Sequence, residues 1–324
     1  MIAAASHRQS GIAALTAMLV VALATVLAVE LLWNTSLDLR RTQNLLERDQ
    51  AIQIGVGLEL LAGELLRVDF EDDPNIDSLS ERWAEDYGFP FEGGNVVGRL
   101  EDMQGRFNLN SLVNERGQRV PEAAAQFRRL VEVIVAGDSD LTVDPESVVD
   151  AVVDWLDPNT LPDGIGGAED GVYTNLTPPY RAANFWFTTT SELLAVDNVT
   201  PDFYTRLAGL VAALPPRIAT PLNVNTALPE VLQTLAQDIS SSDVETWVES
   251  RQSAPFESRD EFLEQAGDIF TKDNPAPALE TGSQWFGLTV IVSVGSTRLA
   301  MYSLLERNAQ NGSVTARLRA FDTP

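Results

Sequence analysis

Residues 11–33, GIAALTAMLVVALATVLAVELLW, form a nearly continuous apolar stretch close to the start of the chain. Its polar interruptions are Thr16, Thr25 and Glu30. As an α-helix, the residues from Ile12 to Trp33 would span roughly 33 Å, which matches a bilayer core of about 30 Å. The stretch therefore predicts a helix that spans a membrane.

A short leader, residues 1–11, precedes this stretch and carries His7 and Arg8 but no acidic residue. A basic leader before an apolar segment is typical of a signal, and the positive-inside rule keeps it on the cytoplasmic side. An Ala-x-Ala-type cleavage motif does not follow the apolar stretch. A cut after Gly11 would instead leave the whole helix on the mature chain, so we expect a retained anchor.

The composition excludes several classes of function. The chain of 324 residues has 47 acidic residues against 22 Lys and Arg, a formal net charge of −25, which disfavours binding to nucleic-acid phosphates. It has no cysteine, and His7 is its single histidine. Disulfides, thiol catalysis, Ser-His-Asp triads and Cys- or His-ligated metals are therefore excluded. Any bound metal would need oxygen ligands, as Ca²⁺ and Mg²⁺ do.

The pattern beyond Trp33 predicts that the helix continues to about Leu66, before Asp72-Asp73-Pro74. The alternative is a plain anchor followed by a separate core helix. Alternating residues predict early strands at 96–102 and 106–109, and late strands at 285–294, 297–306 and 313–321.

A helical block separates the early and late strands. Its helix starts are indicated by the following residues: Pro121, Asp144, Thr200, Ser242 and Ser258. The long helix needs a partner for its apolar face outside the membrane, and the sheet formed by the strands is the natural candidate. The fold class that we predict is α/β: a long N-terminal helix packed on a small antiparallel sheet, with a large α-helical insertion.

The densest polar segment is DWLDPNTLPDGIGGAEDGVY, residues 154–173, with five carboxylates in a Gly- and Pro-rich loop after a helix. Acidic residues are unfavourable at a helix C-terminus unless a cation compensates them, and such a loop offers the oxygens that Ca²⁺ prefers. It is not an EF-hand, because Leu161 occupies the third ligand position. A solvated acidic loop is the alternative. A hydrolase with paired carboxylates is disfavoured because nothing fixes two carboxylates at a defined separation.

A second segment resembles a helix-hairpin-helix module. It comprises PLNVNTA at 221–227, the following residues 228–235 and PFES at 255–258. Its hairpin, QDISS at 237–241, has neither a glycine nor a basic residue. The module is therefore expected without DNA binding.

In order along the chain, four features resemble the minor pseudopilin K family of type II secretion. They are the leader that ends at Gly11, as in a prepilin-peptidase site; EDMQGRFNLN at 101–110; the acidic segment 154–170 with PPYRAAN at 178–184 and SEL at 191–193; and LNVNT at 222–226.

The resemblance implies a pilin-like fold divided into the following ranges: a cleaved leader at 1–11, a transmembrane half-helix at 12–33, the rest of the helix and the first strands at 34–110, an inserted α-helical domain at 111–280, and the C-terminal strands at 281–324. It implies cleavage by prepilin peptidase after Gly11 and methylation of Ile12. The mature chain would be anchored in the bacterial inner membrane, with its C-terminal domain in the periplasm. Its implied role is non-enzymatic: a tip subunit that initiates pseudopilus assembly with the minor pseudopilins I and J, for export through the outer membrane.

Most pilin-like subunits carry a glutamate as the fifth mature residue, which pairs inside the membrane with the terminal ammonium of a neighbour. The fifth residue from Ile12 is Thr16. A tip subunit has no subunit above it, and an unpaired acid in lipid is costly, so the threonine fits that position. The alternative is that Thr16 is simply a tolerated membrane residue.

The resemblance also implies calcium in the insertion. We expect its ligands among the following residues: Asp157, Asp163, Glu169 and Asp170, with Asn159 and Asn175 as further candidates. Two other functions stay open at this point. One is an anchored periplasmic calcium-binding protein unrelated to secretion, and the other is an anchored helix-hairpin-helix protein for DNA uptake.

Overall fold

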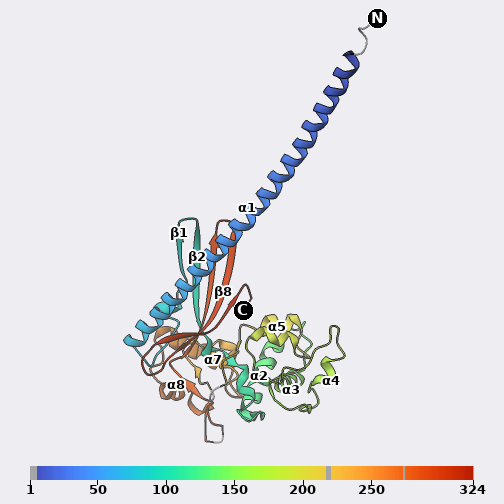
Figure 1. The fold of residues 1–324 in the computed structure, drawn as a ribbon. Coiled ribbons are helices and arrows are strands. Elements are labelled where there is room, and N and C mark those ends of the chain that lie inside the picture. The colour runs from blue at the N-terminus through green and yellow to red at the C-terminus, as the bar shows by residue number, and fades with distance from the viewer. Residues whose placement is uncertain (1–5, 217–219, 273, 324) are drawn as a thin grey trace.

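The computed structural model describes residues 6–216, 220–272 and 274–323, with only the backbone for residues 6–10. Helix α1, Ser6–Asp72, runs unbroken for 67 residues, roughly 100 Å. Its first part projects away from the rest of the molecule, and residues 11–46 are all exposed (Figure 1). The helix is long and apolar enough to cross a membrane. The predicted continuous helix is confirmed, and it ends just before Asp73-Pro74.

The second part of α1 packs on a five-stranded antiparallel sheet with the order β1-β2-β7-β8-β9. The strands are β1 Tyr87–Phe91, β2 Gly94–Asp102, β7 Trp285–Val294, β8 Thr297–Arg307 and β9 Val314–Phe321. The helix buries Ala51, Leu58, Ala62 and Leu66, which fall on one helical face. They meet the inward side chains of alternate residues in β7 and β8, including Val290. The predicted fold class is therefore confirmed.

The three late strands lie where the sequence predicted them. Gly295 and Gly312, with φ of +54° and +68°, provide the turns between them. Strand β1 was not predicted, because Pro90 and Gly88 weaken its strand pattern.

Two local predictions are wrong. The second early strand is only β3, Phe107–Asn108, and it pairs in parallel with β4, Val211–Ala212, outside the main sheet. The cause is a 3₁₀ turn, η2 Met103–Gly105, which is capped by Asp102 and turns the chain away from the sheet. The capping residue of α7, Ser241–Ser253, is Ser240, paired with Asp243, rather than Ser242, since this cap two residues earlier gives both reciprocal hydrogen bonds.

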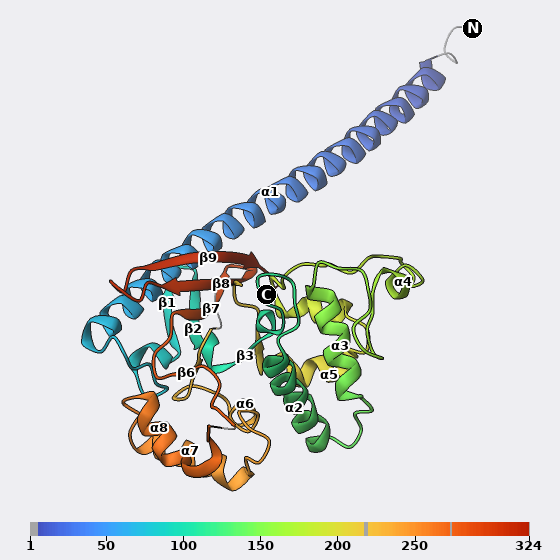
Figure 2. The ribbon, with the colours of Figure 1, turned by 90° about the horizontal axis from the view of Figure 1, so that it is seen from below.

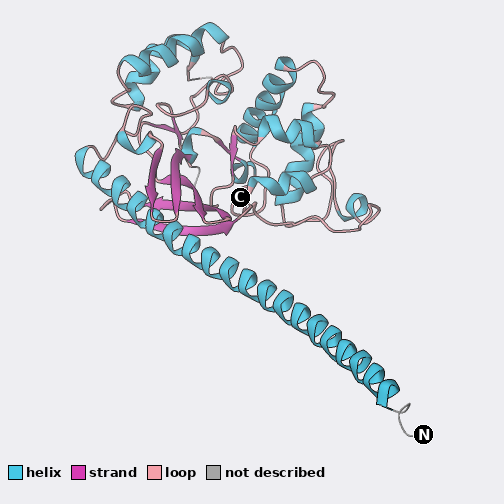
Figure 3. Ribbon diagram, turned by 90° about the horizontal axis from the view of Figure 1, so that it is seen from above, coloured by secondary structure: helices cyan, strands magenta, loops and turns pink. Residues whose placement is uncertain are grey.

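The helical insertion forms two groups of helices on the side of the sheet away from α1 (Figures 2 and 3). The first group contains η3 Leu109–Leu112, α2 Pro121–Gly137, α3 Pro145–Leu156, α4 Asp170–Tyr173, η4 Thr190–Ala195 and α5 Pro201–Leu207. The second contains α6 Pro229–Leu232, α7 Ser241–Ser253, α8 Arg259–Ala266 and η5 Gly267–Ile269, and is closed by β5 Leu222–Asn223 beside β6 Leu279–Glu280. One shared apolar core joins the two groups.

A buried carboxylate joins the insertion to the sheet. Asp102, at the end of β2, accepts hydrogen bonds from the Thr226 hydroxyl at 2.5 Å, the Asn223 amide at 2.9 Å and the Ser283 hydroxyl at 2.6 Å. Burial raises the pKa of Asp102 even so. The motif LNVNT thus supplies the insertion's half of this junction.

Candidate metal centre

Helix α3 carries acidic residues on a face that the fold buries. Asp150 and Asp154 lie one turn apart among valines, and Asp157 follows at the helix end; their exposed fractions are 2%, 0% and 3%. Asp150 has its own cation, because Arg119 Nη1 lies 2.7 Å from Asp150 Oδ1. The described residues give Asp154 and Asp157 no such ion pair.

The loop after α3 folds back onto this face because it is rich in glycine. Gly164 has φ of +68°, and a Cβ there would lie 2.0 Å from Asp150 Oδ2. A Cβ on Gly167 would lie 2.6 Å from Asp154 Oδ2. The glycines therefore let the backbone approach the carboxylates and bring Glu169 beside them.

Buried oxygens without partners gather at this place. Within the described parts of the chain, six buried side-chain polar atoms have no hydrogen-bond partner. Five of them belong to this region: Asp154 Oδ2, Trp155 Nε1, both carboxylate oxygens of Glu169, and Asn184 Oδ1. Because buried polar atoms are normally satisfied, four oxygens without donors in this region fit a cation ligand set.

The raised pKa values of the acidic residues also favour a cation site at this loop. Burial raises the pKa of Glu169 to about 7, and the charges of Asp154 and Asp157 add to the shift. Burial likewise raises the pKa of Asp154 to about 6. Negative charge thus accumulates here at the C-terminal end of α3, where the helix dipole is also unfavourable to it.

The structure brings some of the six predicted ligands together. Asp157 and Glu169 lie at the cluster. Asp163 is 45% exposed, and its backbone N–H donates to Asp154 Oδ1 at 2.9 Å. Asp170 follows Glu169, and its carboxylate accepts from the Ala182 N–H at 3.2 Å. These four carboxylates remain candidates.

The two asparagines are placed differently. Asn159 is exposed, and its amide donates to Asp157 at 2.8 Å, so it orients a carboxylate. Asn175 is exposed and donates to the Gly171 carbonyl at 2.6 Å. No contact in the described residues links Asn175 to the cluster.

Sequence reasoning did not name Asp154 or Asn184 as candidate ligands. Asp154 could have been found as an acidic residue on the apolar face of α3. Asn184, with φ of 46°, is placed by its bond to the Asn159 carbonyl at 3.0 Å, which nothing in the sequence indicates.

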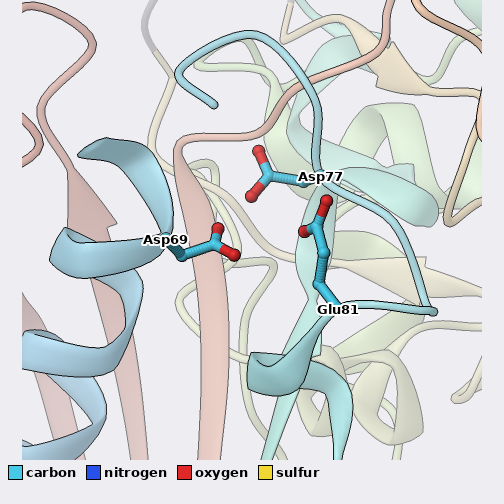
Figure 4. A group of neighbouring side chains, drawn as sticks. All are labelled: Asp69, Asp77 and Glu81. Carbon is cyan, nitrogen blue, oxygen red and sulfur yellow. The ribbon is translucent and has the colours of Figure 1, made fainter. Parts of the chain in front are cut away.

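The oxygens at this loop are not drawn together as tightly as ligands on an ion. Among the described residues, the set of carboxylates whose ligand atoms all lie within 4.8 Å of one another is elsewhere, at Asp69, Asp77 and Glu81 (Figure 4).

At the other end of the molecule, Thr16 lies on the exposed part of α1. Its hydroxyl donates to the Ala13 carbonyl at 3.0 Å. Since this bond stays within the helix, Thr16 needs no partner from another chain in lipid. Residues 1–5 of the predicted leader lie outside the described residues, while Gly11 and Ile12 lie in the helix.

Comparison with known proteins agrees with the resemblance seen in the sequence. Two family models described as type II secretion system protein K match residues 105–216 and 222–278. Type II secretion system protein K of Aeromonas hydrophila is 33% identical, covering 96% of this chain and 97% of that protein. The Pseudomonas aeruginosa protein of the same name is 35% identical, covering 96% and 92%.

A solved structure supports the fold. The neighbour comes from the GspK-GspI-GspJ complex of the enterotoxigenic Escherichia coli type 2 secretion system. It has a TM-score of 0.74 and 24% identity, and the match covers 88% of this chain and all of that one. On the strength of the family models and the nearly full-length relatives, the chain belongs to the type II secretion system protein K family.

Proposed function

We propose that the chain is the minor pseudopilin at the tip of a type II secretion pseudopilus. It initiates pseudopilus assembly with the minor pseudopilins I and J, so that proteins are exported across the outer membrane. The observation that carries this proposal is the match to protein K relatives over 96% of the chain, together with the pilin-like packing of α1 on the sheet. The solved neighbour belongs to a complex with GspI and GspJ, which supports the choice of partners.

The insertion supports a tip position. It extends the molecule away from the membrane helix and leaves residues 11–46 of α1 exposed for contact with other helices (Figure 1). Thr16 is uncharged, so α1 carries no acidic side chain at this position that a neighbouring subunit would have to neutralise inside the membrane. The role is structural rather than enzymatic, and the inner membrane holds α1 while the insertion lies in the periplasm.

Calcium belongs to the same proposal. The acidic loop would hold it through Asp154, Asp157 and Glu169, with Asp163 and Asp170 nearby. A divalent cation supplies the positive charge that the unpartnered oxygens of this loop lack. It would thereby fix the glycine-rich loop against α3.

Processing of the N-terminus tests the assignment. When the full chain is co-expressed with prepilin peptidase, mass spectrometry should find a mature N-terminus at a methylated Ile12. Gly11→Leu should block cleavage. Gly57→Leu is the matched control, because a side chain there meets nothing within 4 Å and lies far from the cut. An intact Met1 on membrane-inserted wild-type chain would contradict the proposal.

A further inference from the structure

A compact group of carboxylates lies where α1 leaves the sheet, far along the chain from the acidic loop. Asp69 is in the last turn of α1, Asp77 is in the following loop, and Glu81 comes just before η1, Arg82–Ala84. Their ligand atoms all lie within 4.8 Å of one another. Figure 4 shows the three carboxylates turned toward a common centre.

One buried cation faces this group. Arg307, at the end of β8, is 2% exposed; it pairs with Asp77 Oδ2 and lies 3.3 Å from Asp69 Oδ2. It also donates to the Ser283 carbonyl at 2.8 Å and stacks on the ring of Phe286. A single guanidinium among three carboxylates leaves two negative charges uncompensated.

A separate observation points to a ligand. Asp77 is completely buried, and its Oδ1 has no hydrogen-bond partner. Arg307 satisfies only the other oxygen, Oδ2, which also accepts the Ser283 N–H at 2.7 Å. A buried carboxylate oxygen without a donor, beside two further carboxylates, is satisfied either by a proton or by a cation.

Glu81 is held in place for this role. Its Oε2 accepts the Trp83 indole N–H at 2.6 Å and the Ser78 N–H at 3.1 Å. These bonds fix the direction of its carboxylate, which points toward Asp77 in Figure 4. The fixed orientation resembles the outer hydrogen bonds that orient ligands at metal sites.

We propose that Asp69, Asp77 and Glu81 bind one Ca²⁺, at a site separate from the acidic loop. A divalent ion brings the summed charge of the three carboxylates and Arg307 to zero. Calcium suits the group better than Mg²⁺, because calcium accepts six to eight oxygens in flexible geometry, whereas Mg²⁺ demands a near-ideal octahedron.

Water can complete the coordination. A cleft of about 580 Å³ lies beside the group, and its lining includes Phe70, Asn75, Ser283 and Arg307. The bound ion would fasten the end of α1 to the loop at Asp77. Since the Asp77 carbonyl accepts from Asn223 at 3.0 Å, the ion also stabilises the junction with the insertion.

The test uses the full chain in detergent, stripped of metal, in an Asp154→Asn, Glu169→Gln background that disables the acidic loop. Terbium is the probe, because Trp83 beside Glu81 would sensitise its luminescence. We expect saturable luminescence that calcium displaces, with one Ca²⁺ bound per chain by calorimetry. Glu81→Gln, which keeps the hydrogen-bond acceptor, should weaken affinity at least about tenfold. The exposed Glu85→Gln should not change it.

Two results would overturn the proposal. One is equal affinity in Glu81→Gln and in the parent. The other is an absence of saturable calcium binding in a parent chain whose circular dichroism is native. In that case the three carboxyl groups would be neutralised by Arg307 and by protonation, without an ion. If Glu81→Gln does not fold, Asp69→Asn gives the same comparison, with Asp72→Asn as its exposed control. None of these results bears on assembly with I and J, which is measured separately.

Discussion

Asn110 and Asn225 perform the same task at two places in the insertion. The amide of Asn110 accepts the Phe187 N–H at 2.8 Å and donates to the Phe187 carbonyl at 2.9 Å. Asn225 binds the backbone of Phe256 in the same two ways, at 2.9 and 3.0 Å. Each asparagine thus satisfies both backbone groups of a residue distant in sequence, inside an otherwise apolar core.

Thr16 gives a prediction for the membrane segment. Thr16→Glu places a carboxylate in lipid without a subunit above to neutralise it, at a cost of up to about 3 kcal/mol for insertion. We expect fewer pseudopili per cell by electron microscopy and reduced secretion. Thr16→Val, which adds no charge, should behave as wild type. Equal defects in the two variants would show that the hydroxyl matters instead.

Glu59 gives a prediction for the contact of α1 with the sheet. Its carboxylate is 6% exposed and accepts from Arg319 Nη2 at 2.5 Å and from the Ser303 hydroxyl at 2.5 Å. Burial alone would raise its pKa, but the hydrogen bonds and charge of Arg319, with the bond from Ser303, outweigh burial and lower the pKa below 4.5. Glu59→Gln should reduce the free energy of unfolding at pH 7 by about 1–3 kcal/mol.

The pair of Glu59 and Arg319 also predicts that the free energy of unfolding depends on pH. Because the folded chain holds this proton less tightly than the unfolded chain, the stabilisation is present above about pH 4.5 and is lost as the pH falls below it. Denaturant unfolding of the full chain at several pH values should therefore show the difference from Glu59→Gln shrinking in acid. Glu64→Gln, an exposed residue paired within α1, should cost less than about 0.5 kcal/mol at every pH. A difference for Glu59→Gln that does not change with pH would contradict this account.

At the scale of elements, the unit that matters is α3 with the loop that folds back on it. Removing calcium should lower the melting temperature of the full chain by about 3–8 °C, because a ligand that binds only the folded state stabilises it. The Asp154→Asn, Glu169→Gln variant should lose less on chelation than wild type. Asn175→Ala, outside the cluster, should respond as wild type does. An unchanged wild-type melting temperature with excess chelator would exclude the site.

The sequence predicted elements better than it predicted the contacts between them. The late strands were foreseeable because alternation and two glycine turns are local signals. The path of residues 103–108 was not, because Asp102 caps a turn there and its other partners, Asn223, Thr226 and Ser283, are over 100 residues away. The motif LNVNT was visible in the sequence, but its partners were not.

At the candidate site, too, contacts between segments were harder to predict from the sequence than the segments themselves. Asp157 and Glu169 could be predicted from a loop dense in acidic residues. Asp154 could be recognised as an acidic residue on the apolar face of α3, but its approach to the glycine-rich loop could not be, because the loop returns to α3 only in the folded chain. Asn175 was a candidate from the family resemblance, yet it lies just after α4 and donates to the Gly171 carbonyl instead.

At the scale of the whole molecule, assembly tests the proposed function. Full-length chain co-expressed with the minor pseudopilins I and J should co-purify with both in detergent, and the complex should bind no duplex DNA. The contact is expected along α1, so placing charges on its exposed face, as in Leu39→Asp with Leu46→Asp, should weaken capture at least about tenfold. Exposed charge reversals on the insertion, such as Glu249→Lys, serve as the control. Failure of wild type to capture either partner would favour an unrelated anchored calcium-binding protein.

The chain leaves the sheet and returns to it at almost the same point. Asp102 of β2 lies opposite Phe286 of β7, and the Gln284 N–H donates to Gln104 Oε1 at 2.7 Å. Topologically, residues 103–284 therefore occupy the place of a single hairpin turn. The entropy of closing a loop grows only with the logarithm of its length, so pairing the two strands across this insertion costs about 3 kcal/mol more than across a short turn. Insertions and deletions at its distal end can accumulate without shifting the strand register, so the membrane-anchored half and the distal half of the molecule are free to diverge at different rates.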